Sequence, residues 1–98
     1  NSFTLPKEFK LYQNYPNPFN PYTLISYDIP KDDFVTIIIY DMNGKIVKTL
    51  INNYQRAGYK IIAWDGTTNK NLLASAGIYL YTIKVGYFRQ TKKMILLK

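Results

Sequence analysis

Residues 34–50 read FVTIIIYDMNGKIVKTL, and this stretch decides the fold class. The odd-numbered residues from Val35 to Ile39 are apolar, whereas the even-numbered positions are mixed, which is the pattern of a strand with one buried face. Asn43 and Gly44 tolerate the positive φ that both central positions of a type I′ turn require. The stretch therefore predicts a β-hairpin with a two-residue turn.

The same pattern continues along the chain, where β-branched and aromatic segments alternate with clusters of Pro, Gly, Asn and Asp. The predicted strands are residues 9–14, 23–29, 34–42, 45–50, 59–65, 77–85 and 88–97. Seven short strands without a helical period predict an all-β sandwich. Trp64 is the single tryptophan, so we expect its ring in the core and a partner for its N–H group.

Composition excludes several kinds of chemistry. The 98 residues include no Cys and no His, so disulfides, thiolate nucleophiles, imidazole bases and zinc sites of the usual types are absent. Four of the six carboxylates fall in turns, where such side chains usually bind their own backbone. We therefore expect no enzyme, no bound metal and no cofactor.

The net charge of +7 is concentrated in the last third of the chain. Residues 66–98 contain six Lys or Arg and no acid, whereas residues 1–65 are nearly balanced. Such asymmetry is compatible with an anionic partner or simply with a solvated strand face. The chain has only two Arg and no RNA-binding aromatic motif, so we do not expect a nucleic-acid partner.

Tyrosine is unusually frequent, with ten in the chain. Exposed rings on a sandwich can stack on sugars or bases, although tyrosine also suits a half-buried pleated surface. The candidates for stacking are Tyr12, Tyr15, Tyr22, Tyr79, Tyr81 and Tyr87.

The segment NYPNPFNP, residues 14–21, cannot be a central strand because its prolines remove three backbone donors. It could guard a sheet edge, or it could act as a rigid recognition element with little ordering cost on binding. Residues 1–8 are expected to be a linker from an upstream domain, since the chain starts without Met and looks excised from a longer protein. No apolar run approaches the roughly 20 residues of a membrane span.

Five motifs, in order, resemble the C-terminal sorting domains (type A) of the bacterial type IX secretion system. They are LYQNYPNPFNP (11–21), YDMNGKIV (40–47), AG followed by WDG (57–58 and 64–66), GIYLY (77–81) and KKMILLK (92–98). Together they extend over residues 9–98, the predicted sorting domain, and five ordered motifs are far more specific than one. The motif residues are Pro16, Asn17, Pro18, Phe19, Asn20, Pro21, Tyr40, Asp41, Gly44, Trp64, Asp65, Gly66, Gly77, Tyr79 and Tyr81.

The resemblance implies an immunoglobulin-like antiparallel β-sandwich and a non-catalytic sorting signal at the end of a secreted cargo protein. The expected partners are the outer-membrane translocon and a sortase-like protease. The expected location is the cell surface or the medium, reached through the periplasm and outer membrane of a Bacteroidetes-like bacterium. In that family the closing strand is important for export, which makes these the expected recognition residues: Lys92, Lys93, Met94, Ile95, Leu96, Leu97 and Lys98.

A physical mechanism for recognition follows if the closing strand is a sheet edge. Backbone pairing with the translocon, or packing against it, along residues 93–97 could then supply affinity, while Lys92, Lys93 and Lys98 attract an acidic component. Two other functions stay open. The chain could be a carbohydrate-binding module of a secreted enzyme, with a row of exposed aromatics, or a structural immunoglobulin-like domain related to that of flagellar hook-capping proteins.

Overall fold

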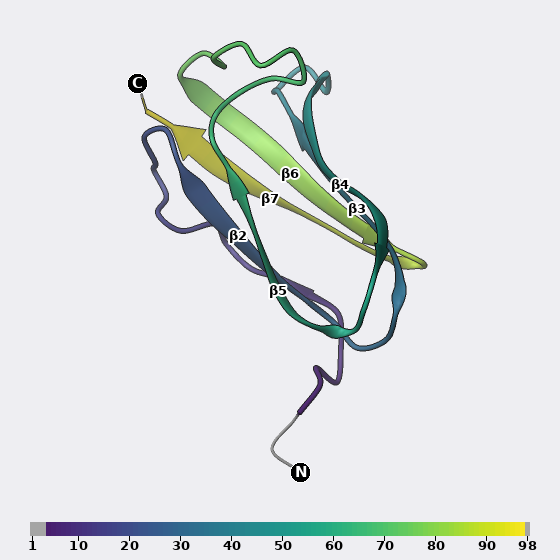
Figure 1. The fold of residues 1–98 in the computed structure, drawn as a ribbon. Coiled ribbons are helices and arrows are strands. Elements are labelled where there is room, and N and C mark those ends of the chain that lie inside the picture. The colour runs from purple at the N-terminus through teal and green to yellow at the C-terminus, as the bar shows by residue number, and fades with distance from the viewer. Residues whose placement is uncertain (1–3, 98) are drawn as a thin grey trace.

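Two antiparallel sheets pack face to face in a computed structural model that describes residues 4–97. The strands are β1 (Lys10–Leu11), β2 (Thr23–Ile29), β3 (Asp33–Tyr40), β4 (Ile46–Gln55), β5 (Gly58–Trp64), β6 (Gly77–Val85) and β7 (Phe88–Leu96). One sheet has the order β1-β2-β5 and the other β4-β3-β6-β7 (Figure 1). The predicted all-β sandwich of seven strands is confirmed, and the described residues form no helix that could cross a membrane.

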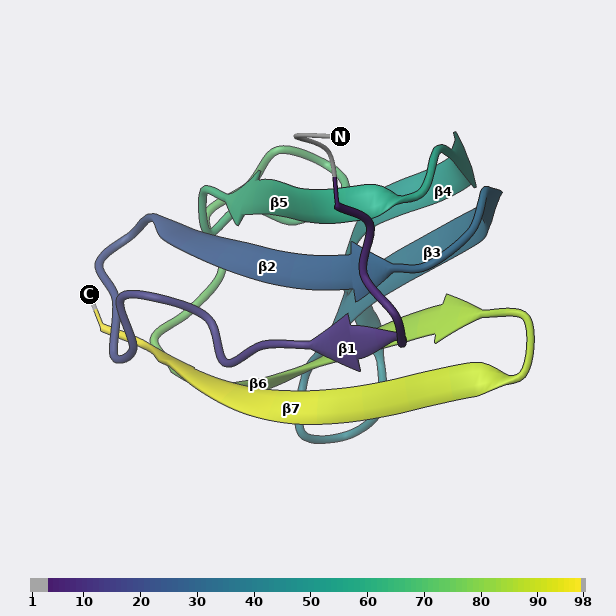
Figure 2. The same ribbon diagram turned by 90° about the horizontal axis from the view of Figure 1, so that it is seen from below.

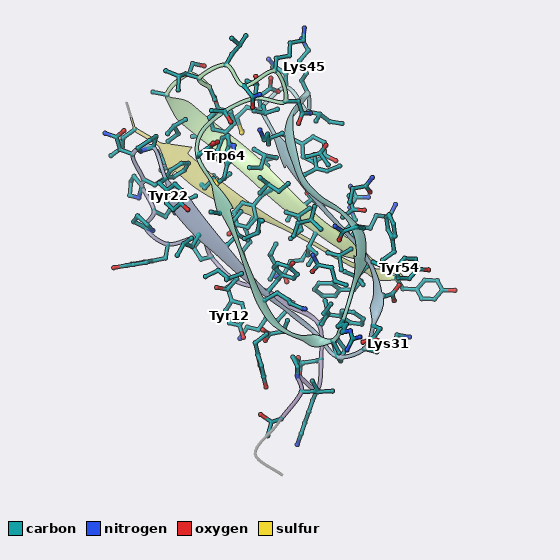
Figure 3. The ribbon with its side chains drawn as sticks, viewed as in Figure 1. Tyr12, Tyr22, Lys31, Lys45, Tyr54 and Trp64 are labelled. Carbon is teal, nitrogen blue, oxygen red and sulfur yellow. The ribbon has the colours of Figure 1, made fainter. Side chains whose placement is uncertain are left out.

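The core lies between the sheets, on the faces that the alternation predicts. Val35, Ile37 and Ile39 of β3 are fully buried, and the alternate residues of β6 are buried opposite them. Trp64 is also fully buried, and its Nε1–H donates to the carbonyl of Thr67 at 2.9 Å. Figure 3 shows the indole between the two sheets, so the expectation for this residue is confirmed.

The hairpin of β3 and β4 forms as predicted, but its turn type was predicted wrongly. Gly44 has a φ of 82°, whereas Asn43 has a negative φ, which excludes a type I′ turn. The Gly44 N–H donates to the carbonyl of Asp41, and the Asp41 carboxylate accepts the N–H groups of Asn43 and Lys45. The turn is therefore a longer one, closed by the Asp41 side chain, with only the glycine in the left-handed region.

Two strands differ from the prediction by more than two residues at one end. The first strand has two residues instead of six, because its pairing with β2 is interrupted after Tyr12, where Asn14 bonds Tyr81 of the other sheet. The pairing resumes only as an isolated bridge between Tyr15 and Leu24. Strand β4 extends to Gln55 rather than residue 50, because its polar second half still pairs with the start of β3. In Figure 2, β1 and the segment that follows it lie between β2 and β7, closing one side of the sandwich.

Candidate functional site

The segment NYPNPFNP, residues 14–21, lies along the outer edge of the closing strand β7 and is called the proline segment below. Phe19 donates its N–H to the carbonyl of Ile95 at 3.0 Å, and its own carbonyl accepts the N–H of Leu97 at 2.7 Å. The Ile95 N–H donates to Oδ1 of Asn17 at 3.0 Å. This short parallel pairing joins the first and the last of the five motifs, which are separated by more than seventy positions in the sequence.

The edge of β7 is also bonded two residues before Ile95, where Nε2 of Gln13 donates to the carbonyl of Lys93 at 2.7 Å. The backbone of residues 93–97 is thus largely paired within the domain. The expectation that residues 93–97 form an open edge for strand addition is therefore wrong, because the proline segment already occupies the edge. Packing of a partner against this strand stays a prediction. The alternative role considered for that segment, guarding a sheet edge, is confirmed.

Tyr81, on the opposite sheet, anchors the segment that follows β1, residues 12–14, which we call the crossing segment. Its hydroxyl accepts the N–H of Asn14 at 2.8 Å and donates to the carbonyl of Tyr12 at 2.8 Å. Burial raises the pKa of Tyr81 to about 12, since the phenolate could not be solvated there. The Asn14 side chain is buried too and donates to Oγ1 of Thr23 at 3.0 Å. Sequence reasoning overlooked Asn14 and Gln13, because nothing local distinguishes them from loop residues.

An aromatic cluster brings three motifs together at this end of the sandwich. The Trp64 ring lies 5.7 Å from that of Phe19 and 5.4 Å from that of Tyr79, centroid to centroid, with the second pair edge to face. The Tyr79 hydroxyl donates to the carbonyl of Ser75, which ties the loop before β6 to the cluster. The rings hold the proline segment against the core, so these motif residues have a structural role.

Glycine at position 66 lets the WDG turn approach the proline segment closely. Gly66 has a φ of 79°, and a Cβ there would lie 3.1 Å from the carbonyl oxygen of Pro21. Beside it, the Thr67 hydroxyl donates to Asp65 at 2.6 Å and is the main reason that the pKa of this carboxyl is lowered. The remaining motif residues lie on turns or strand ends: Pro16, Pro18, Asn20, Tyr40, Asp41, Gly44 and Gly77.

The seven expected recognition residues differ sharply in accessibility. Met94 and Leu96 point into the core and are at most 4 % exposed, so in the folded domain their side chains contact no partner. Lys93 and Leu97 are exposed, and Lys92 and Ile95 are half-buried. Lys98 lies outside the described residues. The accessible part of the closing strand is therefore narrower than the sequence motif.

Comparison with known proteins places this architecture in a family. The sequence profile of the FlgD Ig-like domain matches residues 25–89, about two thirds of the chain. The chain belongs to the FlgD Ig-like domain family. No curated protein sequence matches it.

Two solved structures from Porphyromonas gingivalis share the fold of this FlgD Ig-like domain. A dimeric latent PorU matches with a TM-score of 0.72 and 24% identity over 87% of this chain and 9% of that one. PorZ, described as an essential surface component of the type IX secretion system, matches with a TM-score of 0.60 and 12% identity over 92% of this chain and 11% of that one. The chain thus spans about a tenth of the length of either protein.

Three basic residues of the FlgD Ig-like domain lie on the outer face of β6 and β7. Lys84 lies directly opposite Arg89, and Lys93 lies four positions further along the same face of β7. The centre of this face holds the paired hydroxyls of Thr82 and Thr91, 2.7 Å apart. Lys84 and Arg89 were not singled out from the sequence, although period-two spacing would have grouped them with Lys93 rather than Lys92.

Several of the tyrosines considered for stacking are unavailable in this FlgD Ig-like domain. Tyr79 and Tyr81 are buried, so their selection as stacking residues was wrong. Tyr15, Tyr22 and Tyr87 are exposed, but Tyr87 occupies the turn between β6 and β7, far along the chain from the other two. Figure 3 shows Tyr12 and Tyr22 on the β2 side of the sandwich and Tyr54 on the β4 side.

The aspartate carboxylates of the FlgD Ig-like domain accept hydrogen bonds from backbone and side-chain groups of the domain. Oδ1 of Asp32 accepts the N–H of Ala57 at 2.8 Å, and Oδ1 of Asp33 accepts the N–H of Phe34 at 2.7 Å. Oδ2 of Asp28 accepts the hydroxyl of Tyr12 at 2.6 Å, and this bond raises the pKa of Tyr12. The prediction that turn carboxylates bind their own backbone is confirmed for Asp33, Asp41 and Asp65, whereas Asp32 binds the backbone of a distant loop.

Proposed function

We propose that this chain is a non-catalytic sorting domain of the type IX secretion system. It directs a larger, attached cargo protein through the outer-membrane translocon to the cell surface or the medium. A sortase-like protease is the expected partner after transport. The proposal combines the order of the five motifs with the membership in the FlgD Ig-like domain family and with a fold also found in parts of PorU and PorZ.

The observation that carries the proposal is the junction of the proline segment with β7. Residues 11–21 and the end of β7 lie outside the part of the chain that matches the family profile. Nevertheless they pair with each other through Asn17, Phe19, Ile95 and Leu97. The prolines fix several backbone angles of this segment, and its pairing with β7 holds it in place. Its exposed groups therefore lose little conformational entropy when a partner binds. We propose that the translocon recognises this composite surface rather than an extended tail.

Charge supports an acidic partner for the same region. Lys84, Arg89 and Lys93 form an exposed basic row on the outer face of β6 and β7, whereas Lys92 is half-buried on the opposite face of β7. Opposite charges across an interface mainly speed association and select the partner. We propose that this row steers the domain to an acidic component and that the exposed Leu97 adds an apolar contact.

The proposal is tested by fusing a signal peptide and a reporter enzyme upstream of residues 1–98 in a bacterium with an active type IX system. The reporter should appear on the surface or in the medium, and it should stay in the periplasm of a strain that lacks the translocon. Equal amounts outside both strains would contradict the proposal. Deleting residues 93–98 is not a clean variant, because it removes Met94 and Leu96 from the core and would unfold the domain.

A carbohydrate-binding module is the second candidate, and one observation favours it. Tyr15 and Tyr59 are exposed by 78% and 62%, and both belong to the outer face of the β1-β2-β5 sheet. Rings on one face can stack on sugars. Retardation of the purified chain in gels that contain polysaccharide, lost in Tyr15→Ala and Tyr59→Ala, would support this function, and unchanged migration would exclude it for the polysaccharides used.

A further inference from the structure

The edges of the two sheets are protected to very different degrees. The C-terminal half of the β7 edge is covered by the proline segment, as described above. Strand β4 is interrupted by two register shifts against β3, and Asn69 binds it on the outside through the carbonyl of Val47 and the N–H of Thr49. Strand β5 ends its sheet, and within residues 4–97 no other strand pairs with its outer side.

The hydrogen bonds of β2 determine which groups of β5 face outward. Leu24 exchanges both backbone bonds with Tyr15, and the carbonyl of Ser26 accepts the N–H of Tyr12, so these two residues point away from β5. Their neighbours Ile25 and Tyr27 must point toward it, since backbone direction alternates along a strand. Ile25 lies opposite Ile62, and Tyr27 lies opposite Lys60.

The remaining residues of β5 therefore have outward backbone groups. Tyr59, Ile61 and Ala63 each direct an N–H and a carbonyl to the open edge. Their side chains lie on the solvent face, where Tyr59 and Ile61 are 62% and 60% exposed. β5 contains no proline, and its single charged residue, Lys60, has its side chain on the face opposite to Tyr59 and Ile61. Lys60 is therefore the one usual edge protection that β5 carries.

We propose that this edge pairs with the same edge of a second copy of the chain, in an antiparallel two-fold dimer centred on Ile61. In that register Ile61 lies opposite its symmetry mate and Tyr59 lies opposite Ala63. The outward N–H and carbonyl groups of Tyr59, Ile61 and Ala63 then all find partners, because each of these odd-numbered residues lies opposite another odd-numbered residue of the second copy. Apolar side chains meet on the solvent face, and Lys60 lies beside Ile62, so no like charges are opposed.

Self-pairing is favoured over a foreign strand because the segment is complementary to itself in both backbone and side chains. A two-fold pairing uses this edge on both chains, so the contact closes as a dimer and does not grow further. A contact over so few residues buries far less than the roughly 1,200 Å² of a standard interface, so the dimer is weak. It also forms against the repulsion of two chains that each carry +7, so added salt strengthens it.

The test uses the purified 98-residue chain and is independent of export. In sedimentation equilibrium the average mass should rise from 11.5 kDa toward twice that value as the protein reaches millimolar concentration, and more so at high salt. Amide exchange should slow with concentration at Tyr59, Ile61 and Ala63, while Lys60 and Ile62 stay slow throughout. A mass of 11.5 kDa at every concentration, or slowing at other strands instead, would overturn the proposal.

Variants at one position separate pairing from folding. Ile61→Pro removes an outward N–H that β2 does not use, so the amides of Lys60 and Ile62 should stay protected while the dimer is lost. Ile61→Lys sets two charges face to face at the symmetry axis and should weaken association by about tenfold or more. Ile78→Lys, on the outer face of the other sheet, is the matched control and should leave it unchanged. Dimerisation that survives Ile61→Pro would refute the assignment.

Discussion

Replacing Tyr81 by Phe tests how firmly the crossing segment is held against the sandwich. The substitution keeps the ring in the core and removes only the hydroxyl, which bonds both the N–H of Asn14 and the carbonyl of Tyr12. The Asn14 N–H is buried and would lose its partner. A lost bond contributes about 1 kcal/mol net, and a stranded buried donor costs about 1–3 kcal/mol, so we expect a loss of about 2–4 kcal/mol in the free energy of unfolding.

Urea denaturation at neutral pH measures this loss. Tyr79→Phe is the matched control, because its hydroxyl makes a single bond to a loop carbonyl and its removal should cost only about 1 kcal/mol. Amide exchange at Phe19 and Leu97 should also accelerate in Tyr81→Phe, since the anchor lies next to their pairing. A stability for Tyr81→Phe within about 0.5 kcal/mol of the unmodified chain would refute the reasoning.

The pH dependence of stability supplies a second readout for the same residue. The pKa of Tyr81 is about 12 in the folded domain and about 10 when the chain is unfolded, so between these values the folded state holds the extra proton. Stability from this group is complete below pH 10 and falls by about 2–3 kcal/mol as the pH rises to 12. Tyr81→Phe should lose that part of the alkaline decline and keep the part due to Tyr27, whose pKa burial also raises.

Two further predictions concern the turns. Gly66→Ala combines a left-handed φ with a Cβ 3.1 Å from the Pro21 carbonyl and should lower the free energy of unfolding by about 2–3 kcal/mol. Gly44→Ala has open space around the new Cβ and should cost only about 1 kcal/mol in the same thermal or urea unfolding experiment. Equal costs would show that the close approach to Pro21 is unimportant. Asp65 has a lowered pKa, so its contribution is present above about pH 4 and is lost as the pH falls further. Asp65→Asn should therefore flatten the acid limb of the stability curve by at most about 1 kcal/mol, because the carboxylate is exposed, and an unchanged acid limb would contradict this.

The strands were predicted well because the alternation of apolar and polar residues that marks a strand is a pattern of neighbouring residues. The alternation around Ile37 fixed the buried face of β3, and the single Trp64 identified the core. The turn at Asn43 and Gly44 was predicted incorrectly because the Asp41 side chain supplies bonds that a two-residue turn would take from the backbone. Turn type therefore depended on a residue outside the dipeptide.

The site was predictable only as a set of motifs. Alternation implies that Met94 and Leu96 share one face of β7, but the sequence does not say that this face is the core. The pairing of Phe19 with Ile95 and Leu97 joins the two ends of the chain, and no local signal encodes such a contact. The closing strand was expected to be an open edge, whereas the proline segment beside it makes it a closed one.

Export of the reporter by variants of the exposed strand residues tests the central claim most directly. The double variant Lys93→Glu and Leu97→Asp changes only exposed side chains, so the domain should stay folded with unchanged urea unfolding. The matched control is Lys31→Glu with Tyr87→Asp, which alters exposed residues away from β7's C-terminal half. We predict that the strand variant leaves most of the reporter in the periplasm while the control is exported normally. Normal export of a folded strand variant would contradict recognition through this surface.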